Sequence, residues 1–271
     1  MPEAICSRND IILCDDFEWS TDPNFAATPG DWNAHGWILG ASLTQFPQNN
    51  VYGNSHADVT SGGAGRNSLC GMQQFLPLNA ADTNYPNHPI PSQQGTIHLR
   101  LYVKYSPGYT FNLGQQKIAY LRAVVGDALA WRIELANREF IDRTVGRFIV
   151  DLNIHELILF YNQGINVIIQ SGQWYAVELM ATLNTPGVAN GVIKLWVDGV
   201  LVTHYINVNM RIGAGSASSP INDVIITSYY GGPTAPHPAQ TIWYDNLVVA
   251  TSYIGPIPES APSITVGRRL L

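Results

Sequence analysis

Residues 192–202 read VIKLWVDGVLV, a pattern typical of two β-strands joined by a tight turn. Apolar residues alternate on both sides of Asp198-Gly199, which is a strong β-hairpin signal because a type I′ turn needs positive φ at both central residues. The segment 97–105 has the same period of two, with Leu99, Leu101 and Val103 between polar side chains. Since successive side chains of a strand point to opposite faces, both stretches predict strands with one buried face.

Strand-like segments separated by turn residues recur outward from this hairpin, and helical periodicity is scarce. The expected strands are 12–18, 97–105, 116–123, 130–136, 147–152, 156–161, 165–170, 174–184, 192–197, 200–202, 224–230 and 241–250. Residues 19–95 are rich in Asn, Gly, Pro and Gln, which predicts long loops with short strands such as 70–76. The pattern predicts an all-β fold, a two-sheet antiparallel β-sandwich. We expect residues 1–259 to form one domain, followed by a loose C-terminal tail over residues 260–271.

The composition narrows the class of protein. Of 271 residues, 46% are hydrophobic and 13% are charged, so the chain can bury a sizeable core. The net charge of −6 provides no broad basic field for nucleic acid phosphates. No apolar run reaches the roughly 18 residues that a membrane span needs. We therefore expect neither a nucleic acid partner nor a membrane span, and a homo-oligomer is left open.

Three cysteines bear on the compartment. Cys6 and Cys14 bracket a short loop before the first expected strand and could close as a disulfide, with Cys70 left over. The alternative is three thiols in a reducing compartment. The N-terminus shows no charged segment followed by an apolar one, so no signal peptide is visible.

Five short motifs occur in a characteristic order. They are DDFE at 15–18, NTPG at 184–187, WVDG at 196–199, SYYGG at 228–232 and YDNLVV at 244–249. Together they resemble the concanavalin A-like jelly-roll polysaccharide lyases, in particular alginate and glucuronan lyases. The resemblance covers roughly residues 95–255 plus 12–18. It implies a jelly roll in which the first and last strands pair, and a protein that recognises carbohydrate.

In lyases of this type a lysine, a Ser-x-Arg strand and a pair of tyrosines line the concave sheet. Lys117 sits where the family's lysine would lie, and Arg132 is the candidate arginine. The chain departs from the pattern at Ala130, where the family has serine, and at 147–151, which reads RFIVD without tyrosines. An elimination needs a cation to neutralise the substrate carboxylate and Tyr or His to move protons.

The polar side chains of segment 97–105 supply all these residue types on one strand face. We predict that this row lines a concave face beside Lys117 and Arg132, the alternative being a solvated outer face. The candidate catalytic residues are His98, Arg100, Tyr102, Lys117 and Arg132. The candidate substrate-binding residues are Lys104, Tyr229 and Tyr230.

Three acids suggest a structural calcium site. Asp16, Glu18 and Asp245 fall on segments that should be adjacent in a jelly roll, and oxygen ligands suit this hard cation. The alternative is that these acids cap turns. The histidines lack metal-ligand spacing, which argues against zinc.

Two functions compete at this point. The first is a polysaccharide lyase that cleaves an anionic, uronate polymer by β-elimination. The second is a non-catalytic, lectin-like binding or structural decoration protein of a virion, filament or cell surface. A glycosidase of this fold would need closely spaced carboxylates on one strand, and the sequence shows no such cluster. For either function we expect a location outside the cell, or on a virion or cell surface.

Overall fold

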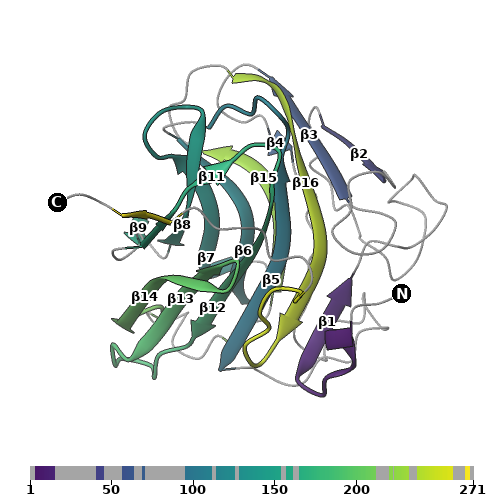
Figure 1. Ribbon diagram of the computed structural model, residues 1–271. Helices are drawn as coiled ribbons and strands as arrows, with labels where there is room; N and C mark the ends of the chain where they lie inside the picture. Colours follow the sequence, from purple (N-terminus) through teal and green to yellow (C-terminus); the bar gives the residue numbers. More distant parts are fainter. Residues whose placement is uncertain are drawn as a thin grey trace.

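The chain forms two antiparallel sheets packed face to face (Figure 1). The computed structural model describes residues 4–15, 41–45, 57–63, 69–70, 95–111, 114–125, 128–153, 157–160, 165–211, 220–221, 223–231, 237–258 and 266–268. Within these ranges the only helix is the short 3-10 helix η1 (Ala4–Ser7), and no helix is long and apolar enough to cross a membrane. The two-sheet, all-β sandwich expected from the alternation is confirmed.

The first sheet, called sheet 1, has the strand order β14-β13-β12-β5-β16-β3-β2, and β1 also pairs with β16. Its strands are β14 (Val200–Val208), β13 (Gly191–Val197), β12 (Trp174–Thr182), β5 (Thr96–Tyr105), β16 (His237–Ala250), β3 (Ala57–Gly63), β2 (Ala41–Gln45) and β1 (Ile11–Asp15). Leu13 of β1 pairs with Val249 of β16, which confirms that the first strand lies beside the closing strand.

The second sheet, called sheet 2, has the order β11-β8-β7-β6-β15-β4, with β9 paired to β8. Its strands are β11 (Ile169–Gln170), β8 (Val145–Asn153), β7 (Ala128–Glu139), β6 (Gln115–Val125), β15 (Asp223–Gly231), β4 (Leu69–Cys70) and β9 (Leu157–Phe160). A separate ribbon pairs β10 (Ile165–Val167) with β17 (Val266–Arg268). The segment expected to be a loose tail therefore contains a strand, whose backbone groups are satisfied by β10.

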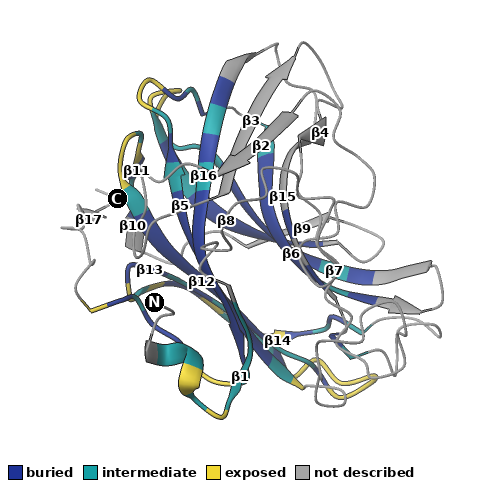
Figure 2. Ribbon diagram, turned by 90° about the vertical axis from the view of Figure 1, so that its right-hand side faces the viewer, coloured by how far each residue is buried: buried dark blue, intermediate teal, exposed yellow. Residues whose placement is uncertain are grey.

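The core lies between the two sheets. Leu99 and Leu101 of β5, Leu121 of β6 and Ile133 and Leu135 of β7 are fully buried there in one hydrophobic cluster. Buried residues run along the strands of both sheets, whereas exposed residues gather in turns (Figure 2). The period of two seen in the sequence thus assigns one face of each central strand to the core.

The predicted hairpin is present between β13 and β14. Val197 pairs with Val200, and the turn residues Asp198 and Gly199 both have positive φ, at 49° and 79°. The Asp198 carboxylate accepts a hydrogen bond from the Ala176 backbone N–H at 2.7 Å. Burial raises the pKa of Asp198 to about 6, and the hydrogen bond from Ala176 acts in the opposite direction.

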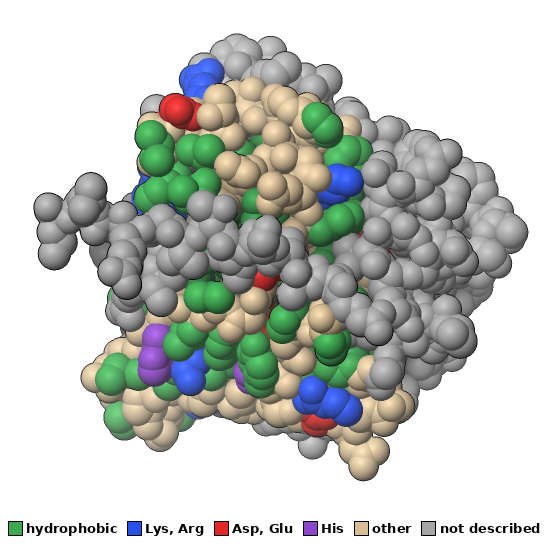
Figure 3. Space-filling view, in the orientation of Figure 1, with side chains coloured by type: hydrophobic (Ala, Val, Ile, Leu, Met, Phe, Trp, Pro, Cys, Tyr) green, Lys and Arg blue, Asp and Glu red, His purple; other side chains and the backbone are tan. Residues whose placement is uncertain are grey.

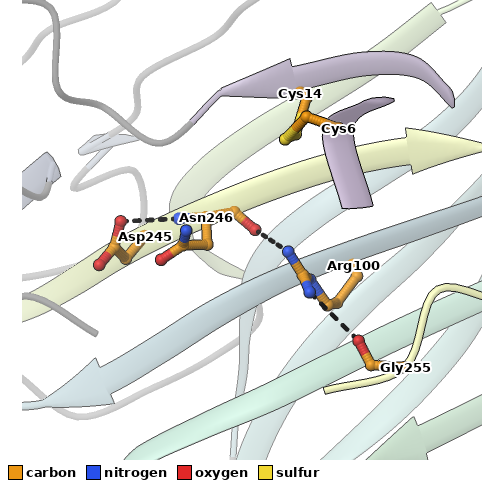
Figure 4. Close-up of a disulfide and its surroundings, with 6 residues drawn as sticks. All are labelled: Cys6, Cys14, Arg100, Asp245, Asn246 and Gly255. Atoms are coloured by element: carbon orange, nitrogen blue, oxygen red, sulfur yellow. Dashed lines mark hydrogen bonds between the residues drawn. A yellow bond between two sulfur atoms is a disulfide. The ribbon is translucent and has the colours of Figure 1, made fainter. Parts of the chain in front are cut away.

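The short loop before β1 is closed by a disulfide between Cys6 and Cys14, which settles the pairing left open by the sequence (Figure 4). Arg8 in this loop donates hydrogen bonds to Ser252 Oγ at 2.8 Å and to the Tyr253 carbonyl at 3.0 Å. The loop is thereby attached to residues 251–258, which follow β16 and are called the C-terminal strap below.

We predict that Asp198→Asn stabilises the protein increasingly as the pH rises from 3.8 to about 6. In this window the folded carboxyl keeps a proton that the unfolded one releases, so the natural chain loses stability as the pH rises through the folded pKa. Asparagine tolerates positive φ, suits a type I′ turn and can still accept from Ala176. Urea unfolding of both proteins across this pH range measures the difference. Asp198→Ala, which removes the acceptor, should be destabilised at every pH, and a constant difference for the Asn variant would contradict the prediction.

Candidate functional site

The predicted polar row on β5 is covered by the C-terminal strap. His98, Arg100 and Tyr102 lie on the face of sheet 1 opposite the core, and all three are buried. The Arg100 guanidinium donates to the carbonyls of Gly255 and Asn246, each at 3.1 Å (Figure 4). The expected alternation is confirmed, but this part of the row faces the chain's own backbone.

A buried carboxylate completes the attachment of the strap. Glu178 of β12 accepts hydrogen bonds from the backbone N–H groups of Ile254, at 3.0 Å, and Gly255, at 2.8 Å. The same carboxylate contacts His98 Nδ1 at 2.7 Å, and the Tyr102 hydroxyl accepts from the Ile257 N–H at 2.6 Å. These contacts satisfy polar groups that would be costly to bury unpaired.

The expectation that this row lies beside Lys117 and Arg132 is wrong. The row belongs to β5 in sheet 1, whereas Lys117 and Arg132 belong to β6 and β7 in sheet 2. Alternation correctly assigns a side chain to a face, but it cannot tell whether solvent or a distant segment covers that face.

Lys117 and Arg132 do come together, on the face of sheet 2 that points away from the core. Lys117 Nζ lies 3.0 Å from Asp151 Oδ2 of β8 and also pairs with Glu134 Oε2 of β7. The second oxygen of Glu134 accepts a hydrogen bond from Arg132 Nε. One buried carboxylate therefore links the two basic residues that the resemblance singled out.

The register of β6, β7 and β8 places further charged side chains on the same face of sheet 2. Tyr120 of β6 lies across from Glu134, which lies across from Asp151, and Arg138 lies across from Arg147. Among the described side chains, this face carries five basic residues and two acidic ones. They are Lys117, Arg122, Arg132, Arg138 and Arg147, with Glu134 and Asp151.

The centre of this face is buried and its rim is accessible. Glu134 and Asp151 have no exposed surface, whereas the Arg132 side chain is 30% exposed. Burial raises the pKa of Asp151 to about 6, while the Lys117 ammonium acts in the opposite direction. The Arg132 guanidinium lies over the Tyr120 ring, 5.4 Å from its centroid. Arg132 is thus the partly exposed group, and the Tyr120 ring beneath it is buried.

Sequence reasoning missed Glu134, Asp151 and Tyr120. The signal that could have found them is the same alternation, since Arg132 and Glu134 are two residues apart between core residues of one strand. The convergence of Glu134 and Asp151 on Lys117 depends on the pairing of three strands, which cannot be read from any one strand's sequence. The two carboxylates come from neighbouring strands, so a search for acids on one strand cannot detect them.

The remaining candidates are only partly described. Tyr229 pairs in register with Lys117, but its side chain and that of Tyr230 lie outside the described residues, so their binding role stays a prediction. Asp16 and Glu18 also lie outside them. Asp245 is buried, and its carboxylate accepts from the Asn246 N–H at 2.8 Å. The described part of the chain contains no cluster of three metal-ligating side chains, and the calcium site stays a prediction.

We predict that Lys117→Met lowers the free energy of unfolding by about 3–5 kcal/mol, because it leaves Glu134 and Asp151 buried without their cation. Chemical denaturation measures the loss. A triple variant that adds Glu134→Gln and Asp151→Asn is the matched control. It should recover most of the stability, since it removes the uncompensated charges as well. Equal stability of Lys117→Met and the natural chain would show that the ion pairs contribute nothing.

Comparisons with known proteins agree with this architecture. A family model described as polysaccharide lyase 14 matches residues 165–247, and no curated protein matches the chain. A marine alginate lyase of this class from Aplysia kurodai superposes with a TM-score of 0.62 at 11% identity, covering 89% of this chain and 99% of the other. An alginate lyase from a Chlorella virus gives 0.60 at 14% identity, with coverage of 90% and 100%.

A third solved structure, the endo-β-1,4-glucuronan lyase of the fungus Trichoderma reesei, gives a TM-score of 0.52 at 15% identity, covering 80% of this chain and 92% of the other. At such identities the likeness concerns the fold. The resemblance inferred from the sequence motifs is confirmed: the chain is a two-sheet jelly roll similar to the alginate and glucuronan lyases.

Proposed function

We propose that the chain binds an anionic, uronate-containing polysaccharide on the outer face of sheet 2 and cleaves it by β-elimination. The observation that carries this proposal is the concentration of five basic side chains on one face of a chain whose net charge is −6. A cationic face on an acidic protein attracts polyanions selectively. The three structural neighbours are named as lyases of alginate and glucuronan, which are both uronate polymers.

Arg132 and the buried Tyr120 beside it have the chemistry that an elimination needs. Arg132 can pair with the substrate carboxylate in bidentate fashion, and its orientation is held by Glu134. Tyr120, whose ring lies beneath this guanidinium, is the candidate proton-transfer group, because a tyrosine hydroxyl can pass a proton to or from a reacting group. In the step itself the C5–H bond breaks and its proton passes to the base. A C4–C5 double bond forms, and the C4–O bond breaks toward an oxygen that takes up a proton.

Binding without cleavage is the second candidate function. It is favoured by one observation: the Lys117 ammonium already contacts two carboxylates, Glu134 and Asp151, and is buried with them. Ala130 stands where the resemblance would place a serine. A lectin-like protein needs the cationic face but no base.

We further propose an extracellular location, or one on the surface of a virion or cell. The support is the Cys6–Cys14 disulfide, because such bonds persist mainly in oxidising compartments.

We predict that incubation with alginate or glucuronan produces the ultraviolet absorbance of unsaturated uronates, whereas a neutral glucan does not. Tyr120→Phe should abolish this signal and retain binding, since it removes only the ionisable hydroxyl. Arg132→Ala should weaken binding about tenfold or more, as expected for the loss of one charge-assisted pair.

The matched control is Lys194→Ala, which removes one half-buried cation from sheet 1 and should change neither activity nor binding to sheet 2. Binding of uronate polymers without any absorbance would establish the lectin-like alternative. Unchanged binding by Arg132→Ala would place the ligand away from this face.

A further inference from the structure

A second group of aromatic and basic side chains lies on the opposite side of the sandwich. Trp174 of β12 pairs in register with Lys104 of β5, which pairs in register with Trp243 of β16. The three residues therefore form one row across three adjacent strands of sheet 1. Each of them is partly exposed, in contrast to the buried His98, Arg100 and Tyr102 on the same strand face.

The row is held as one unit by contacts of its own. The Lys104 ammonium lies 5.7 Å from the ring centroid of Trp174 and 5.1 Å from that of Trp243. Trp174 packs against the buried cluster of Tyr102, Ala176 and Ile257, where the C-terminal strap meets the sheet. Hydrophobic side chains lie on this side of the molecule among polar and charged ones (Figure 3). Two partly exposed indoles on either side of one lysine are unlike the mixed charges of an ordinary solvated sheet face.

The geometry of the row matches an extended sugar chain. Adjacent strands are about 4.8 Å apart, so the two tryptophans are separated by roughly 10 Å, which is about the length of a disaccharide unit. Indole rings offer large, rigid apolar surfaces to the C–H faces of sugar rings. Burial lowers the pKa of Lys104, and a partly desolvated ammonium gains more from an anion than one in bulk water.

We propose that Trp174, Lys104 and Trp243 form a second, non-catalytic binding site for an acidic polysaccharide. The chain of sugars runs along the row, across the strands. Two sugar rings contact the indoles and a uronate carboxylate pairs with Lys104. This assigns Lys104 to substrate binding on the face opposite Arg132, so a long polymer can be held at a place distant from the charged face of sheet 2. The ligand class rests on the proposed function, whereas the site itself does not depend on catalysis.

The test is a titration of the full-length protein with alginate oligosaccharides, with intrinsic tryptophan fluorescence as the readout. Trp243→Ala and Trp174→Ala should each weaken the fluorescence-detected binding about tenfold, and Lys104→Gln should weaken it and reduce its salt dependence. Lys104→Arg should retain it. Because Trp174 also packs under the strap, a melting curve of each variant verifies folding, and Trp243→Ala keeps the test valid if Trp174→Ala unfolds.

Trp196→Ala is the matched control. Trp196 also has a lysine over its ring, Lys194 at 5.9 Å, but this pair stands beside His98 and Tyr253 and is not part of the row. Its removal should leave binding unchanged. An equal loss in Trp196→Ala and Trp243→Ala would overturn the proposal, because aromatic contact would then be unspecific. Unchanged binding in Trp243→Ala and Lys104→Gln would overturn it as well.

This experiment tests the proposed function on sheet 2 and the second site on sheet 1 independently of each other. If only the Arg132→Ala variant loses binding, the site on sheet 1 is refuted and the proposed function stands. If only the row variants lose binding, the cationic face is refuted and the second site stands. If the proposed function stands, release of unsaturated product from short oligosaccharides should be unaffected by Trp243→Ala.

Discussion

A single buried guanidinium connects three parts of the chain that are far apart in sequence. Arg100 sits at the centre of β5, and its two hydrogen bonds end on Asn246 of β16 and on Gly255 of the strap. Because burying a guanidinium costs less free energy when its donors are paired, these two hydrogen bonds favour the path that the strap takes. The Glu178 carboxylate accepts hydrogen bonds from N–H groups of the same strap. Arg100 and Glu178 therefore pair with both the carbonyl and the N–H groups of one backbone segment.

This arrangement separates the two outer faces of the sandwich. On sheet 1 the middle of the outer face is covered by the C-terminal strap. Arg8, in the loop closed by the disulfide, donates hydrogen bonds to this strap. On sheet 2 charged side chains of three strands meet around Lys117. The same alternation thus places buried polar side chains on the outer faces of both sheets, where they contact the strap on sheet 1 and one another on sheet 2.

Much of the fold could be predicted because its signals are local. The Asp198-Gly199 turn, the β5 alternation and the neighbouring positions of β1 and β16 follow from patterns within a few residues or from motif order. The position of Lys117 and Arg132 on one face was accessible through the resemblance. The cover over Arg100 was not, since it depends on a segment about 150 positions away. The convergence of Glu134 and Asp151 on one ammonium could not be predicted either, because the sequence of one strand does not specify its register with the next.

The pairing of β16 has a consequence for how the chain is made. This strand lies between β5 on one side and β3 and β1 on the other, yet it follows all three of them in the sequence. Before β16 is in place, the edges of β5, β3 and β1 that pair with it are exposed. Exposed strand edges can pair with other chains, which promotes aggregation. Its contacts with β1 join residues more than 200 positions apart, which slows folding because closing a longer loop costs more conformational entropy. The sheet is therefore completed by inserting β16 between strands that precede it in the sequence, so this part of sheet 1 cannot form during synthesis before β16 has been made.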